Sequence, residues 1–278
     1  MSLLQPPPYI REEKAWYFLS IFYSRNAWAE LLPHVMQFYN ERQTQFCNCL
    51  ISFSDNRGEH IQVALISPDC EKNYQTEIEN FFRSFLEKNP TVSTKVFPYG
   101  KKLWCDYPNN SLAWNTFKCI NYTELLINFH QKTMQLALQL LDDDFSNDNI
   151  FTLVLYLTTK GLTYFDPNMQ NSTASDALNK IMSDFRDYAS VELALQSIIE
   201  QIDQQHMCEA IQSYVEEDSS EYSVELIEWL VAVENMQEKE FKYFYDMTCY
   251  MTGLSGAYLI LVLNLIAIWQ KTSPTTAN

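Results

Sequence analysis

The chain has 278 residues, of which 47% are hydrophobic and 14% aromatic, so it can bury a large core and is not disordered in bulk. It contains neither GxGxxG nor GxxxxGK[ST], which excludes the common dinucleotide and phosphate-binding loops, and no cofactor is expected. The net charge of −16 is concentrated in residues 125–278, where 7 Lys/Arg stand against 22 Asp/Glu, and such a surface would repel nucleic acid.

The first hundred residues predict alternating strands and helices. An extended arm over residues 1–14, with three consecutive prolines, comes first. The elements then expected are a strand at Ala15–Tyr23, a helix at Asn26–Glu41, a hairpin at Phe46–Ile66, a helix ending at Asn89, and a short strand at Val92–Phe97. The order strand, helix, strand, strand, helix, strand indicates an antiparallel ferredoxin-like sheet, and hence an α+β fold.

The second half is predicted to be mostly helical. After a helix containing Leu125 to Leu140, further helices are expected at Ser175–Tyr188, Val191–Val215, Ser223–Tyr245 and Met247–Gln270. Residues 15–278 are interpreted as a single domain with an α+β part over 15–120, a helical part over 121–270 and a tail over 271–278.

The hairpin carries the first candidate site. Its two extended runs flank the polar stretch Asp55-Asn56-Arg57-Gly58, which suits a chain reversal. Because side chains alternate along a strand, Ile61, Val63 and Leu65 share one face, and His60 and Gln62 lie on the other. We therefore expect this polar row to mark a site if the protein has one.

Two features concern the location of the protein. The seven cysteines form neither a disulfide framework nor a zinc set, which favours buried thiols in a reducing cytoplasm, and no metal is expected. Tyr250–Trp269 is twenty residues without a charge. A buried core helix and a C-terminal membrane anchor both fit it, and the polar residues within it and the lack of flanking basic clusters favour the core helix.

Several stretches resemble one known family. An aromatic strand, Trp16-Tyr17-Phe18-Leu19, is followed by a helix and a strand, and then by His60-Ile61-Gln62-Val63-Ala64, which matches a His-Leu-Arg-Leu-Arg motif. Tyr99-Gly100 matches an Arg-Tyr-Gly-Gly turn, and Phe129–Thr159 matches the next helix pair. Through these segments the chain is similar to the C-terminal domain of lantibiotic dehydratases, which also occurs alone as thiopeptide-type bacteriocin biosynthesis proteins.

The resemblance implies work on a precursor peptide. In the family this domain eliminates glutamate from glutamylated Ser or Thr, and relatives build a pyridine ring by cycloaddition between two dehydroalanines. Elimination needs a base for the α-proton and cations for the departing carboxylate. Here Gln62 and Ala64 replace the two motif arginines, Pro98 stands before Tyr99, and the C-terminal His and Asn-Arg positions fall near Thr248 and Thr252-Gly253.

The candidate site residues follow from these matches. His60 is the candidate catalytic residue, and the side chains expected to surround an anionic group of the peptide are Arg57, Gln62, Tyr99, Lys101 and Lys102. Three functions stay open: a lyase-type enzyme acting on the precursor, a non-catalytic member that binds the precursor or a larger dehydratase subunit, and a tail-anchored membrane protein. The expected partners are the precursor peptide and either a larger subunit or a second copy.

Overall fold

The computed structural model describes residues 8–92, 107–115, 122–166, 173–184, 188–236 and 239–272. The chain forms two compact units. The sheet unit comprises Met1–Thr123 and Asp142–Ser146, and the helical unit comprises Glu124–Leu141 and Asn147–Asn278. The predicted α+β class, with a sheet in the N-terminal part and a mostly helical second half, is confirmed. The extent of the domain stays a prediction.

The sheet unit contains an antiparallel sheet. Its described strands are β1 (Tyr9–Arg11), β2 (Lys14–Phe22), β3 (Asn48–Ser54), β4 (His60–Ser67) and β5 (Ser111–Trp114). The strand order is β1-β2-β4-β3. Strand β5 also pairs with β2, along Leu19–Phe22, whereas β1 pairs with the earlier residues Lys14–Trp16. The order β5-β2-β4-β3 is that of a ferredoxin-like fold, as predicted.

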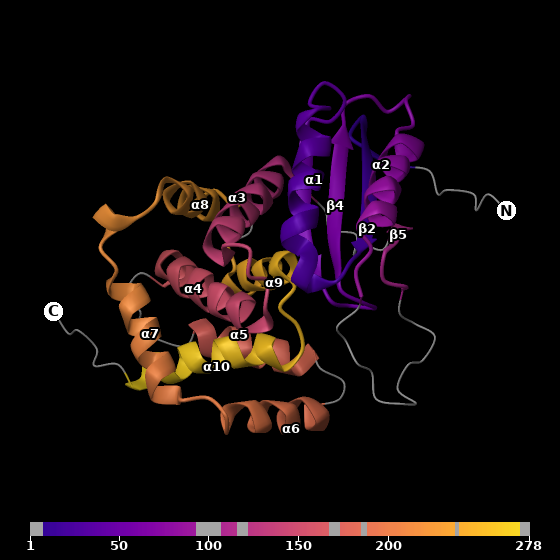
Figure 1. Cartoon of the computed structure of the whole chain (residues 1–278). Helices are drawn as coiled ribbons and strands as arrows, with labels where there is room; N and C mark the ends of the chain where they lie inside the picture. Colours follow the sequence, from indigo (N-terminus) through magenta and orange to yellow (C-terminus); the bar gives the residue numbers. More distant parts are fainter. Residues whose placement is uncertain are drawn as a thin grey trace. The chain divides into compact units, whose positions relative to one another are not determined.

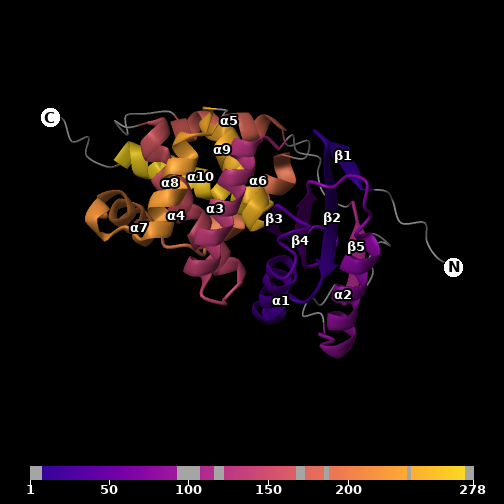
Figure 2. The same cartoon turned by 90° about the horizontal axis from the view of Figure 1, so that it is seen from above.

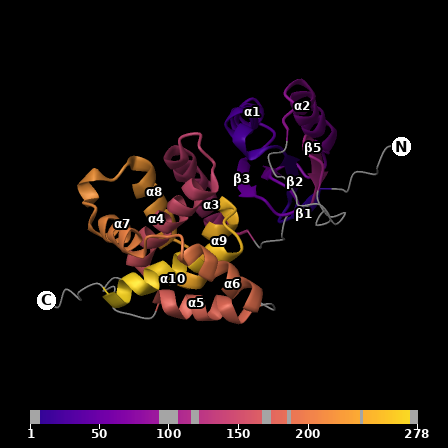
Figure 3. The ribbon, with the colours of Figure 1, turned by 60° about the horizontal axis from the view of Figure 1, so that its bottom comes forward.

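Two helices cover one face of this sheet. Helix α1 (Trp28–Asn40) follows the short 3₁₀ turn η1 (Arg25–Ala27), and α2 (Gln75–Lys88) follows β4. The two helices lie side by side over the strands (Figures 1 and 3). Tyr17 of β2 points to this face, since its ring packs edge-on against Phe46 and Tyr74. The core between sheet and helices therefore contains a cluster of aromatic rings among its aliphatic side chains.

One strand beside β2 was not predicted from the sequence. The predicted strand Val92–Phe97 lies outside the described residues, apart from Val92. In the described part of the chain, β5 pairs with β2, and the pairing starts where the Asn110 N–H donates to the Phe22 carbonyl at 2.8 Å. With four residues after an Asn-rich turn, β5 is too short for a periodic signal.

The helical unit is built from eight helices in its described residues. They are α3 (Glu124–Leu141), α4 (Asn147–Phe165), α5 (Thr173–Asp184), α6 (Tyr188–Ile199), α7 (Gln204–Glu216), α8 (Val224–Glu234), α9 (Phe241–Thr252) and α10 (Ala257–Thr272), with a 3₁₀ turn η2 (Ser219–Glu221). Helix α10 packs on α5, α6 and α7, while α3 packs on α8 and α9 (Figures 2 and 3).

Several predicted helices are divided by local capping. The expected helix Val191–Val215 is α6 and α7, because the Asp203 side chain caps α7 by accepting from the His206 N–H at 3.1 Å. The apolar stretch Tyr250–Trp269 is likewise divided, because α9 ends at Gly253, whose φ of 77° closes the helix. Most of the apolar side chains of α10 are buried. In the described part of the chain, no helix combines the length and apolarity needed to cross a bilayer.

Candidate functional site

The β3–β4 turn depends on a glycine. Arg57 and Gly58 have positive φ angles of 63° and 119°, and the Gly58 N–H donates to the Asp55 carbonyl at 3.3 Å. A Cβ at Gly58 would lie 3.2 Å from Cδ1 of Phe22. Only glycine combines this backbone angle with so close an aromatic ring. The turn thus brings the end of β2 against the start of β4.

The strand register collects polar residues on the sheet face opposite α1 and α2. His60 is paired with Phe22 of β2 and Ser54 of β3, and Gln62 is paired with Ser20 and Ser52. Residues directly across an antiparallel pair share a face. Tyr17, on the helix-covered face, is paired with Leu65, so His60 and Gln62 face the other way.

This polar row is buried. His60 is 2% exposed and Gln62 is 6% exposed, and Ser20 and Ser52 are completely buried. The alternation predicted for β4 is present, but all of its residues are buried on both faces. Buried polar groups need hydrogen-bond partners, and the side chains of the row supply part of them.

His60 has partners at both ring nitrogens. Its Nδ1 lies 2.7 Å from the Gly58 carbonyl oxygen, and its Nε2 lies 3.2 Å from Nε2 of Gln62. A carbonyl can only accept, so Nδ1 carries the proton, and Nε2 then accepts from the Gln62 amide. The hydrogen bonds therefore assign the neutral imidazole with its lone pair at Nε2.

An aromatic stack connects His60 with Arg57. The centroid of the Phe22 ring lies 4.5 Å from that of the His60 ring and 4.5 Å from that of the Tyr107 ring. The Arg57 guanidinium lies over Tyr107, with Cζ 4.6 Å from the ring centroid. The backbone completes the contact, because the Tyr107 N–H donates to the Arg57 carbonyl at 2.9 Å. Arg57 is at the exposed end of this stack and His60 at its buried end.

The hydrogen bonds of His60 and Gln62 are compatible with a neutral or a protonated imidazole. If Nε2 of His60 takes a proton, a rotation of the Gln62 carboxamide presents its oxygen as acceptor. An imidazole that can be held in either state is the commonest general acid or base near neutral pH. In the described residues, no three His, Cys, Asp or Glu side chains are grouped so as to hold a metal.

The structure brings together three of the six residues singled out from the sequence. His60 and Gln62 are hydrogen-bonded, and Arg57 joins them through the stack. Tyr99, Lys101 and Lys102 lie outside the described residues. Sequence reasoning missed Phe22 and Tyr107. Phe22 ends a recognised aromatic strand, but its contact with His60 depends on a register that the sequence does not contain.

The fold is shared with proteins of known structure. No protein-family model and no curated protein matches the sequence. The solved structure of TbtD, a pyridine synthase from thiomuracin biosynthesis, matches with a TM-score of 0.59 at 14% identity, over 91% of this chain and 97% of that chain. TsrL matches with a TM-score of 0.57 at 12% identity, over 92% of this chain and 94% of that chain. The likeness therefore extends over both units, and at these identities it shows a common fold.

Proposed function

We propose that this protein takes part in making a ribosomally synthesised, modified peptide of the thiopeptide or lanthipeptide type, and that it works on the precursor peptide. The observation that carries this proposal is the fold, which matches the thiomuracin pyridine synthase over 91% of the chain. The family motif that begins with His60 supports it, because that histidine is retained and lies in a buried polar row.

The proposed chemistry is elimination at a glutamylated Ser or Thr. His60 takes the α-proton at Nε2, the Cα–H electron pair forms the Cα=Cβ bond, and the Cβ–O bond breaks to release the glutamate carboxylate. Arg57 suits the carboxylate because a guanidinium stays charged and binds it with two parallel hydrogen bonds. Tyr99, Lys101 and Lys102 are proposed to contact the same anionic group.

A second candidate is a member that binds the precursor, or a larger dehydratase subunit, without catalysis. Two observations favour it. Both ring nitrogens of His60 are already engaged, and buried Gln62 and Ala64 stand where the family motif has arginines. Such a protein would still present the peptide to another enzyme.

The test is deletion of the gene in its own host, followed by mass spectrometry of the small peptides. Accumulation of a precursor that is glutamylated, or that keeps uncyclised dehydroalanines, supports the proposal. An unchanged peptide profile overturns it. A tagged copy that restores the strain also shows, by intact mass, whether a peptide or a larger subunit is retained with the protein.

His60→Asn separates the two candidates. An Asn side-chain amide can still donate to the Gly58 carbonyl as Nδ1 of His60 does, but it offers no basic nitrogen. His206→Ala, at an exposed position of α7, is the matched control. If the His60→Asn protein folds but fails to restore modification in the deletion strain, His60 is catalytic. If it restores modification, the non-catalytic binding function is supported.

A further inference from the structure

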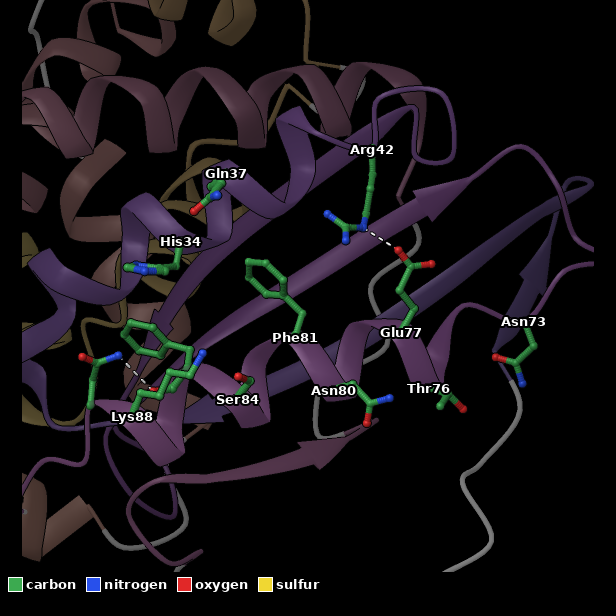
Figure 4. Close-up of a pocket in the computed structure, with 12 residues that line it drawn as sticks. His34, Gln37, Arg42, Asn73, Thr76, Glu77, Asn80, Phe81, Ser84 and Lys88 are labelled. Atoms are coloured by element: carbon green, nitrogen blue, oxygen red, sulfur yellow. Dashed lines mark hydrogen bonds and ion pairs between the residues drawn. The ribbon is translucent and has the colours of Figure 1, made fainter.

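A groove runs between α1 and α2 on the outer side of the helix layer (Figure 4). It has a volume of about 830 Å³. Figure 4 shows Phe81 near its middle, His34 and Lys88 toward one end, and Arg42 and Glu77 toward the other. The polar row of His60 belongs to the opposite face of the sheet, so the groove is a separate site.

One wall of the groove is a ladder of hydrogen-bonding side chains. Thr76, Asn80 and Ser84 are spaced four residues apart on α2, so they share one face of the helix. Among the described residues, none of these three side chains has a hydrogen-bond partner, and all three belong to the groove lining. From Thr76 to Lys88 the ladder extends about 18 Å, at about 1.5 Å per residue.

The facing wall offers further polar atoms over an aromatic floor. His34 packs on Phe85 at 4.4 Å between ring centroids, and its Nδ1 lies 2.9 Å from the Glu30 carbonyl oxygen. Since that carbonyl can only accept, Nδ1 is the donor, and Nε2 of His34 is left to face a ligand. The side-chain amide N–H of Gln37 donates to Glu41 at 2.8 Å, and the side-chain oxygen of Gln37 can accept a hydrogen bond from a ligand.

The charged side chains of the groove differ in whether they already have an ion-pair partner. The Glu77 carboxylate accepts from Nε of Arg42 at 2.6 Å, and Glu41 accepts from Gln37 and from Arg42. Arg42 is held by the Phe38 and Phe81 rings, 4.2 and 5.5 Å from Cζ, and its Nη2 has no partner among the described residues. Lys88 is exposed and forms no ion pair within the described part of the chain. Two carboxylates therefore balance Arg42, and among these side chains the charge left without an ion pair is that of Lys88, in a chain whose net charge is −16.

We propose that this groove binds an extended, acidic segment of a peptide. A ladder of hydroxyl and carboxamide groups matches the alternating donors and acceptors of an extended backbone, and about 18 Å accommodates about five residues at 3.3 Å each. Lys88 then pairs with a carboxylate of the peptide at one end, and Nη2 of Arg42, whose charge is shared with Glu77 and Glu41, donates a hydrogen bond at the other. Phe81 and Phe85 supply apolar contact between them. That the peptide is the precursor rests on the proposed function, whereas the acidic specificity rests on the groove alone.

The experiment measures binding to the full chain by fluorescence anisotropy. The probe is a short fluorescein-labelled peptide that alternates glutamate and valine, and its twin carries lysine in place of glutamate. We expect the glutamate peptide to bind, the lysine twin to bind at least tenfold more weakly, and binding of the former to weaken with added salt. Equal binding of both peptides, or tighter binding of the lysine twin, overturns the proposal.

Two variants locate the binding. Lys88→Glu reverses the open cation and is expected to weaken binding of the glutamate peptide about fivefold to tenfold. Arg83→Glu makes the same charge change on α2 at a residue outside the groove lining, and is expected to leave binding within about twofold of the unchanged protein. Asn80→Trp fills the groove without changing charge and is expected to abolish binding. Equal affinity of all three variants and the unchanged protein places the peptide elsewhere and overturns the proposal.

The two proposals fail separately. If the deletion strain accumulates precursor but the Lys88→Glu protein binds the probe like the unchanged protein, the groove inference is wrong and the proposed function stands. If the groove variants behave as expected but deletion leaves the peptide profile unchanged, the groove binds an acidic peptide of another origin.

Discussion

The ammonium nitrogen of Lys160 lies 2.7 Å from Oε2 of Glu217, and the Lys160 side chain is only 2% exposed. The same ammonium lies 3.0 Å from the Tyr222 hydroxyl and 4.4 Å from the centre of its ring. The Tyr156 hydroxyl donates to Oε2 of Glu217 at 3.1 Å. This cluster connects α4 to the segment from Glu217 to Tyr222, which includes η2, inside the helical unit.

We predict that the two ends of this pair respond differently to substitution. Glu217→Ala leaves a buried ammonium without its anion, and we expect a loss of about 2 kcal/mol, at the low side for a buried pair because Glu217 is partly exposed. Lys160→Met removes the charge and fills similar space, so we expect a loss under about 1 kcal/mol. Denaturant unfolding followed by circular dichroism measures both. A larger loss for Lys160→Met would contradict this account of the cluster.

Alkaline pH should destabilise the helical unit. Burial is the largest cause, and the nearby Cys249 the next, that raises the pKa of Tyr245 well above its usual value of 10.0. Burial also raises the pKa of Tyr156 and of Tyr214. Between about pH 10 and these raised pKa values, the unfolded chain loses protons that the folded chain keeps. The stability contribution is therefore complete below about pH 10 and is lost as the pH rises further.

Tyr245→Phe tests this assignment. The Tyr245 hydroxyl donates to the Leu259 carbonyl, so the variant is expected to be about 1 kcal/mol less stable at pH 8. It should nevertheless lose less stability than the unchanged protein between pH 8 and pH 11. Thermal unfolding across this range measures both effects, and exposed Tyr9→Phe is the control. Parallel curves for the unchanged protein and Tyr245→Phe would remove Tyr245 as a cause.

The cysteines should differ in reactivity. Burial raises the pKa of the Cys49 thiol to about 12 and that of the Cys249 thiol further, whereas Cys47 and Cys70 are exposed. At pH 8 a thiol with a pKa near 12 is thiolate in about one molecule in ten thousand, and the thiolate is the reactive form. We expect iodoacetamide to label Cys47 and Cys70 in the folded protein, the partly exposed Cys49 more slowly, and Cys249 only after unfolding. Peptide mapping reads this out, and equal labelling of Cys249 and Cys70 would contradict it.

Gly161→Ala should destabilise α4 although alanine favours helices. A Cβ at position 161 would lie 2.3 Å from Cζ of Phe244, whose side chain is completely buried. The higher helix propensity of alanine stabilises the folded state by about 1 kcal/mol, while overpacking a core destabilises it by about 1–3 kcal/mol. We therefore expect a net loss of about 1 kcal/mol. In a double-mutant cycle with Phe244→Leu the loss from Gly161→Ala should shrink, and additive losses would show that the ring is not the obstacle.

Local sequence patterns determined the fold class and most of the element order. The aromatic and β-branched run at Ala15–Tyr23 and the alternation after His60 depend on neighbouring residues alone, and both are strands in the structure. The helical second half was predicted for the same reason. Where helices were divided, at Asp203 and Gly253, single capping residues interrupted a continuing apolar pattern.

The candidate site depended on the tertiary structure. His60 and Gln62 could be placed on one face from alternation, but Phe22 and Tyr107 join them only through the register of β2 on β4 and the return of the chain to the turn at Gly58. A slip of one residue would turn every side chain of a strand to the other face, and nothing within a single strand specifies its partner. The groove between α1 and α2 and the Lys160–Glu217 pair are likewise contacts between distant segments. They form because packing brings these segments together, which no local period encodes.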